Sequence, residues 1–152
     1  MTKYIISIAG WLATAYAIAC QPGCAPDVDG FVLEHATTEQ TAAVQSAVDL
    51  WCAVGLCVHL GDGESSIDFA GYVRPGSDAG HKAMSDGSAR IAVRPTVQGA
   101  RLVNAIAHEL GHHFGCDESA DTASLMSWIN SEAPRALSDA DVACAGGARR
   151  VE

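Results

Sequence analysis

The sequence predicts an α+β domain, on the evidence of its length, its composition and the order of its hydrophobic patterns. The 152 residues are close to the size of one ordinary domain, and 49% are hydrophobic against 18% charged. A helical pattern is followed by short strand-like segments and then by two more helical patterns, which is typical of helices layered on a sheet. This composition argues against intrinsic disorder and against a collagen-like repeat.

The charge balance argues against a nucleic-acid partner. Nine Lys and Arg stand against eighteen Asp and Glu, which gives a formal net charge of -9. A surface of this kind is not built to neutralise phosphates or anionic lipid. We therefore expect no nucleic-acid partner. We also expect the chain to be monomeric, and the motif described below, not the charge, leads us to expect a peptide or protein substrate.

Residues 1–19 resemble a signal peptide. Lys3 precedes an apolar stretch over residues 4–19, whose last three residues have the small-x-small pattern that signal peptidases accept. About sixteen apolar residues are fewer than the roughly 20 that a membrane-spanning helix needs. We therefore expect an exported protein that is secreted to the extracellular space or held in the cell envelope.

Cys20 directly follows the expected cleavage site. The sequence Ala-Ile-Ala-Cys resembles a bacterial lipobox, although Ala17 stands where Leu is usual. A lipid anchor on Cys20 and free secretion both stay open. Residues 20–36 are rich in Pro, Gly and Asp, so we expect a tether or extended lead-in there, with the folded domain over residues 37–152.

A first helix is predicted from Thr38, as N-cap, to about Cys52. Apolar residues recur at mostly helical spacings along this segment, and Gly55 follows it. Four short strand-like segments come next, of which the third is a possible edge strand. They span residues 56–60, 67–73, 81–84 and 89–93.

Two more helices are predicted after the strands. From about Gln98 a helical pattern with one apolar stripe continues until Gly115 breaks it. A last helix is expected to start at Ser138, because Ser138-x-x-Asp141 is the aspartate analogue of a capping box. The apolar stripe of the middle helix consists of Leu102, Ile106 and Leu110.

The middle helix carries the motif H-E-x-x-H at residues 108–112. Four residues advance about 400° along a helix, so His108 and His112 lie on one face and can bind Zn²⁺ together. Glu109 flanks such a metal, where it can take a proton from zinc-bound water and pass it to the leaving amine. The bare motif also fits a solvated helix face, so its context has to decide.

The context extends the motif through Gly115 to Glu118, and Met126 follows eight residues later. This longer pattern resembles the metzincin metallopeptidases, and the step of eight residues is similar to that of matrixins. The resemblance implies a small domain with a twisted mixed β-sheet, an N-terminal helix, an active-site helix and a C-terminal helix. It also implies a turn at Gly115 that returns a third zinc ligand, and an apolar floor made by Met126.

The third ligand departs from the family pattern. The family usually has His there, or Asp in some members, whereas this chain has Glu118 preceded by Asp117. A carboxylate is an accepted catalytic zinc ligand. We favour Glu118, with Asp117 as the alternative. His113 lies about 140° around the helix from His108, so we expect it in flanking surface or packing.

Two other positions follow from the resemblance. Trp128 stands where the family builds the wall of its main specificity pocket, and a core role is equally open. Cys24 lies in a segment that faintly resembles the matrixin cysteine switch, in which a thiolate occupies the open zinc position. A disulfide or tether role is the alternative for Cys24.

Three histidines are isolated in the sequence, and all are expected at the surface or in packing. They are His35, His59 and His81. Only His81 is near enough to the edge strand to approach substrate.

The cysteines are expected to pair, because export places the six thiols in an oxidising compartment. The preferred pairs are Cys52 with Cys57, which closes a short loop, and Cys116 with Cys144, which ties the active-site segment to the last helix.

The sequence therefore predicts a secreted or lipid-anchored zinc endopeptidase. Substrate would add as an extended strand beside the edge strand, with zinc as the cofactor and Glu109 assisting the attack of zinc-bound water. The alternative is a catalytically inactive, metzincin-like envelope binding module, which the unusual Glu118 supports. A disulfide-stabilised surface domain without metal is a third possibility.

Overall fold

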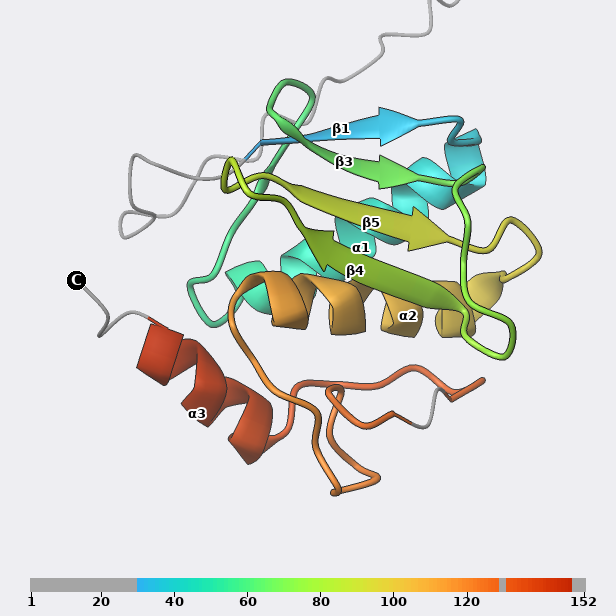
Figure 1. The fold of residues 1–152 in the computed structure, drawn as a ribbon. Coiled ribbons are helices and arrows are strands. Elements are labelled where there is room, and N and C mark those ends of the chain that lie inside the picture. The colour runs from blue at the N-terminus through green and yellow to red at the C-terminus, as the bar shows by residue number, and fades with distance from the viewer. Residues whose placement is uncertain (1–29, 129–130, 149–152) are drawn as a thin grey trace, which may run out of the picture.

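A computed structural model describes residues 30–128 and 131–148. The predicted signal peptide, Cys20, Cys24 and residues 20–29 of the predicted lead-in lie outside these ranges. Within them, a sheet is covered on one face by two helices, and a third helix lies beyond them in the C-terminal part of the chain (Figure 1). No helix of the described residues is long and apolar enough to cross a membrane.

The sheet is mixed and has five strands in the order β2-β1-β3-β5-β4. Strand β1 pairs in parallel with β2 and β3, and β3 pairs in parallel with β5. Strand β4 is antiparallel to β5 and forms one edge of the sheet. The strands are β1 (Gly30–Glu34), β2 (His59–Leu60), β3 (Ser65–Asp68), β4 (Ala79–Ala83) and β5 (Ala89–Val93).

Strand β1 corrects the predicted lead-in. Phe31 within it is fully buried, and the strand lies inside the sheet between β2 and β3. A Cβ on Gly30 would collide with the backbone carbonyl of Asp62, so the glycine that suggested a tether is needed for close packing. The apolar run of β1 is too short to stand out beside the Pro, Gly and Asp residues before it.

The remaining strands differ from prediction mainly at their ends. The predicted strand 56–60 shrinks to β2, and 67–73 becomes β3, which starts earlier and ends at Asp68. The Asp68 carboxylate accepts a hydrogen bond from the backbone of Ala70, which turns the chain out of the sheet. The predicted edge strand 81–84 is β4, shifted toward the N-terminus, and 89–93 is confirmed as β5.

Helix α1 (Thr38–Cys52) starts one residue earlier than predicted, because its N-cap is Thr37 rather than Thr38. The hydroxyl of Thr37 accepts from the backbone of Gln40 while the Gln40 side chain accepts from the backbone of Thr37. This reciprocal pair is a capping box, and it outcompetes the neighbouring threonine because only Thr37 has Gln three residues on.

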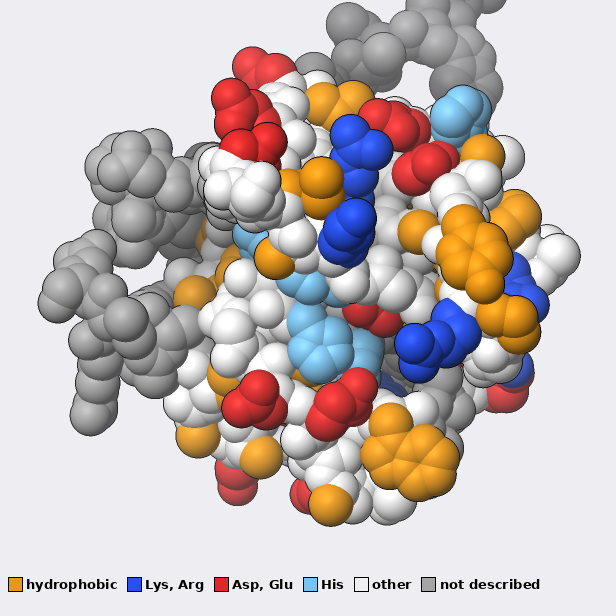
Figure 2. All heavy atoms as spheres, viewed as in Figure 1, with side chains coloured by type: hydrophobic (Ala, Val, Ile, Leu, Met, Phe, Trp, Pro, Cys, Tyr) orange, Lys and Arg blue, Asp and Glu red, His pale blue; other side chains and the backbone are white. Residues whose placement is uncertain are grey.

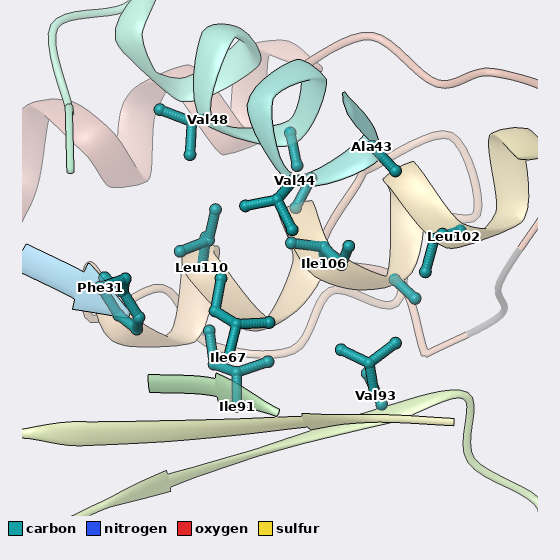
Figure 3. Close-up of a cluster of buried hydrophobic side chains, with 14 of the residues drawn as sticks. Phe31, Ala43, Val44, Val48, Ile67, Ile91, Val93, Leu102, Ile106 and Leu110 are labelled. Carbon is teal, nitrogen blue, oxygen red and sulfur yellow. The ribbon is translucent and has the colours of Figure 1, made fainter. Parts of the chain in front are cut away.

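Helix α2 (Gly99–His113) packs against α1 and against strands β4 and β5, and side chains of both helices and of the sheet meet in one core (Figure 3). The predicted stripe Leu102, Ile106 and Leu110 is buried in this core. Trp51 of α1 donates a hydrogen bond from its indole nitrogen to the carbonyl of Ala107, at 2.7 Å. The buried indole thus fixes α1 against the helix that carries the motif.

The C-terminal part ends in helix α3 (Asp139–Ala148), which begins after Ser138 as predicted. The capping interaction is reciprocal, with the Ser138 backbone donating to Asp141 and the Asp141 backbone donating to the Ser138 hydroxyl. Both preferred disulfides are present, Cys52 with Cys57 and Cys116 with Cys144. The second one links the segment after α2 to α3.

Candidate metal centre

His108 and His112 extend from the same face of α2, as their spacing predicts. Their Nε2 atoms lie 3.1 Å apart. The Nδ1 atom of His108 lies 3.1 Å from the carbonyl of Leu125, and that of His112 lies 2.9 Å from the carbonyl of Cys116. Because a carbonyl only accepts, both Nδ1 atoms carry the proton, and in the neutral rings both Nε2 lone pairs face each other.

Glu118 completes the cluster. Its Oε1 atom lies 3.5 Å from the Nε2 atom of each histidine. Gly115, at φ 83°, provides the predicted turn out of α2, in a conformation that glycine adopts without strain. Asp117 is exposed and is not in this group, so the structure brings Glu118 rather than Asp117 to the histidines.

Three acceptor atoms at these separations fit a zinc ion. Tetrahedral bonds of about 2.0–2.1 Å place neighbouring ligand atoms about 3.3–3.4 Å apart. The observed separations of 3.1 Å and 3.5 Å lie on either side of that value. Two lone pairs and a carboxylate facing one another need a cation between them, and the carbonyls on the Nδ1 side are the outer partners that zinc-binding histidines ordinarily have.

Glu109 lies beside this cluster and is largely buried, with 8% of its surface exposed. Burial raises the pKa of Glu109, the two histidines oppose the rise, and the Glu118 carboxylate adds to it. The backbone N–H of His81 in β4 donates to the Glu109 carboxylate. A carboxylate with a raised pKa next to a metal site is suited to general acid–base work.

Met126 lies under α2, as the resemblance implies. It is almost fully buried, and a Cβ on Gly111 would collide with its sulfur and approach Trp51. The second variable position of the motif is therefore glycine because the methionine and the indole occupy the space beside it. Any larger residue at position 111 would push the helix away from its floor.

Asp141 organises the segment that carries Met126, a role that the sequence did not reveal beyond helix capping. Its buried carboxylate accepts from the hydroxyl of Ser124, at 2.6 Å, and from the backbone of Leu125, at 2.9 Å. Burial alone would raise the pKa of Asp141, but these bonds and those from Ser138 outweigh it and lower the pKa. Since the Leu125 carbonyl orients His108, Asp141 supports the histidine indirectly.

The other histidines lie where the sequence predicts. The ring of His113 packs edge-on against Phe31 at 5.0 Å and lies 6.1 Å from the ring of His81. His35 and His59 are at the surface and lie within 3.1 Å of Asp68 and Asp62 respectively. His81 is partly buried beside His112, and burial lowers its pKa.

A pocket of about 330 Å³ opens next to the cluster. Its walls come from the segment that enters β4, from one side of α2 and from the segment after Met126. Figure 2 shows histidine side chains in a hollow of this face, with acidic and basic side chains around them. Trp128 is 73% exposed and lines this pocket, so the core role considered for it is wrong.

The fold is similar to that of a solved protein. Archaemetzincin from Methanopyrus kandleri matches with a TM-score of 0.59 and 13% sequence identity, over 81% of this chain and 96% of that one. The sequence matches no family model and no curated protein. The chain therefore has a metzincin-like α+β fold, whereas the more specific likeness to matrixins stays a prediction.

Proposed function

We propose that the protein is a zinc-dependent endopeptidase that is exported and acts outside the cytoplasm, either free or anchored through a lipid on Cys20. The observation that carries the proposal is the convergence of three ligand atoms within 3.5 Å of one another, with both imidazoles oriented by backbone carbonyls. The metzincin-like fold supports it, because the site lies where the H-E-x-x-H motif meets the turn that follows α2.

His108, His112 and Glu118 would hold the metal. When bound there, zinc supplies a Lewis acid that polarises the scissile carbonyl and makes water more acidic. Glu109 does not need to bind the ion, since it neighbours the first histidine in sequence and projects beside the cluster. Its carboxylate takes the proton of the attacking water and later delivers that proton to the leaving amine.

Strand β4 offers a place for substrate. It pairs with β5 along one side only, and the other side of the strand faces α2 and the candidate metal centre. An extended peptide can satisfy the open backbone groups of an edge strand by adding to it. Such binding would place a peptide bond across the cluster, which favours internal cleavage of peptides or proteins.

Cleavage of a quenched fluorescent peptide pool by the zinc-loaded protein tests the proposal. Glu109→Gln keeps the size of the side chain but removes the base, so it should bind zinc and lose at least about a hundredfold in rate. Glu39→Gln changes the same group on the exposed start of α1 and should cleave normally.

One observation favours a second function, a metzincin-like binding module without catalysis. Glu118 replaces the usual histidine and is 55% exposed, so it neutralises part of the zinc charge from a solvated position. Stoichiometric zinc without cleavage of any peptide in the pool would favour this module. Cleavage equal in wild type and Glu109→Gln would reject the proposed mechanism.

Cys24 belongs to the proposal as a candidate latency switch. Its thiolate would block the open metal position until the first residues are removed. Activity that rises after mercurial treatment in the wild type, but not in Cys24→Ser, is the expected result. Equal activity of the two proteins without treatment would remove this role.

A further inference from the structure

The pocket beside the candidate metal centre contains an arginine, Arg135, that forms no ion pair with any residue that the structure describes. Five charged residues line this pocket, together with polar and apolar ones. They are Asp78, Arg101, Glu109, Glu118 and Arg135. A charged group that already has a partner in the protein is not available to a ligand, so the partners of these five decide what the pocket can bind.

The two acidic residues nearest the histidines are already engaged. Glu118 faces the two Nε2 atoms, and Glu109 lies beside them as the candidate base. With a divalent ion at the cluster, their negative charges are balanced there. The two glutamates together with the divalent ion therefore carry no net negative charge that would draw a positively charged ligand into the pocket.

Arg101 already forms ion pairs with two carboxylates. Its Nε and Nη2 atoms donate to both oxygens of Asp78, at 2.6 Å and 2.8 Å, and its Nη1 atom donates to Glu132 at 2.8 Å. Such a bidentate pair is among the stronger hydrogen-bonded arrangements of side chains. Arg101 cannot take a further carboxylate without giving up one of these two.

Arg135 differs from Arg101 because no carboxylate of residues 30–128 or 131–148 forms an ion pair with it. Its Nη1 atom donates to the carbonyl of Ser124 at 2.9 Å, and its backbone N–H donates to the side chain of Asn104 at 3.1 Å. The guanidinium is held in place by a neutral acceptor, and most of its N–H groups are left for another partner.

Asn104 fixes the wall on which Arg135 lies. It is 3% exposed on α2, one turn before His108, and it also donates to the carbonyls of Ser131 and Ala133. The position of the arginine is thus set by the same helix that positions the histidines. A guanidinium that is preorganised in this way loses little freedom when it binds a carboxylate.

We infer that this pocket selects an acidic side chain, Glu or Asp, on the substrate residue next to the scissile bond, and that Arg135 determines this preference. The inference rests on the proposed function, because only a peptidase places the selected residue next to a scissile bond. The selectivity itself is a property of the pocket and is measurable by binding. A hydrogen bond between ionised partners in a partly desolvated pocket favours Glu over the isosteric Gln by about tenfold or more.

Short peptides with a zinc-binding hydroxamate test the inference by titration calorimetry on the zinc-loaded full chain. They are identical except for the residue next to the hydroxamate, which is Glu, Gln, Leu or Lys, and they are prepared with the hydroxamate at either end to cover both sides of the cluster. On one side, the Glu peptide should bind at least about tenfold more tightly than the Gln peptide.

Three variants test whether Arg135 determines the preference for an acidic side chain. Arg135→Gln removes the charge and leaves a polar side chain on the same wall, so it should lose the preference and keep its affinity for the Gln peptide. Arg135→Glu should favour the Lys peptide, a reversal that a merely structural role would not produce. Arg90→Gln removes an equal charge from the exposed side of β5, outside the pocket, and should bind as the wild type does.

Equal binding of the Glu and Gln peptides to the wild type would overturn the inference, as would binding of none of the four. A preference that survives in Arg135→Gln would overturn the role of Arg135. Cleavage of peptides without acidic preference would reject the inference and leave the proposed function standing. Selective binding without any cleavage would reject the function and leave the pocket selective for acidic side chains.

Discussion

The candidate metal centre joins two regions that are built in different ways, the helix α2 and the segment of residues 114–138 that follows it. His108 and His112 share one face of α2 because they are four residues apart. The segment reaches the same place without a helix or a strand in its described residues, apart from one isolated bridge between Ser119 and Ser127. Two residues four apart stay on one face of a helix when residues elsewhere are substituted, whereas the course of an irregular segment depends on a few specific contacts.

The contacts that hold the segment of residues 114–138 in place come from three sources. The buried carboxylate of Asp141 holds Ser124 and Leu125, and the disulfide from Cys116 to Cys144 closes the segment against α3. The Arg135 side chain also donates to the Ser124 carbonyl. We therefore expect substitution of a histidine ligand of α2 to abolish metal binding directly, and substitutions at the supports of the segment to act on stability.

Removal of one histidine should have the largest effect. His112→Ala takes away one of three ligand atoms, so zinc that copurifies at one ion per chain should be lost, as metal analysis would measure. His113→Ala is the matched control one residue further, because this ring packs against Phe31 and is not part of the ligand cluster. Retention of stoichiometric zinc in His112→Ala would contradict the assigned site.

Glu118→Ala tests whether the irregular segment provides the third ligand. Zinc affinity should fall strongly, yet less than in His112→Ala, because Glu118 is 55% exposed and water can replace its oxygen. Asp117→Ala, beside it, should retain the affinity of the wild type in a competition titration with a chromophoric chelator. The opposite order of the two variants would assign the ligand to Asp117.

The disulfide from Cys116 to Cys144 should be the largest single support of the segment. It closes a loop of 28 residues, so replacing both cysteines by Ser should lower the free energy of unfolding by about 3–4 kcal/mol. Replacing Cys52 and Cys57, which are five residues apart, should cost about 2 kcal/mol. Urea titration of the two double variants compares them, and equal losses would show that loop length does not govern the effect.

Asp141→Asn should have a smaller, pH-dependent effect. The amide cannot accept from all of the donors that surround the carboxylate, so we expect a loss of about 2 kcal/mol at neutral pH. Because the folded pKa of Asp141 lies below its ordinary value of about 3.9, its contribution is complete above about pH 5 and is lost as the pH falls through the folded pKa.

The difference in unfolding free energy between wild type and Asp141→Asn should therefore shrink in acid. Asp139→Asn changes an exposed carboxylate in the same turn of α3 and serves as the control, with a change below about 1 kcal/mol. A difference that grows toward low pH would contradict the assigned direction of the pKa.

Sequence patterns with a fixed period were sufficient to predict much of the fold and of the site. The helices α1 and α2, strand β5, the pair of histidines and both disulfides were predicted closely, since each depends on neighbours in the chain or on simple pairing. Strand β1 was missed, because Gly30 suggested a tether where it permits contact with the backbone of Asp62. The N-cap lies one residue before the predicted Thr38, because Thr37 forms a capping box with Gln40.

The sequence by itself therefore determined the helix face of His108 and His112 and the candidate base Glu109, because these depend on local spacing, and the resemblance to a known family added the methionine that follows. Only the tertiary structure decided that Glu118 rather than Asp117 faces the histidines, that Trp128 lines a pocket, and that Asp141 supports Leu125 and through it His108. It alone also brought Arg135 beside α2. The physical reason is that these side chains meet through an irregular segment, whose course is set by buried hydrogen bonds and packing between residues distant in the chain.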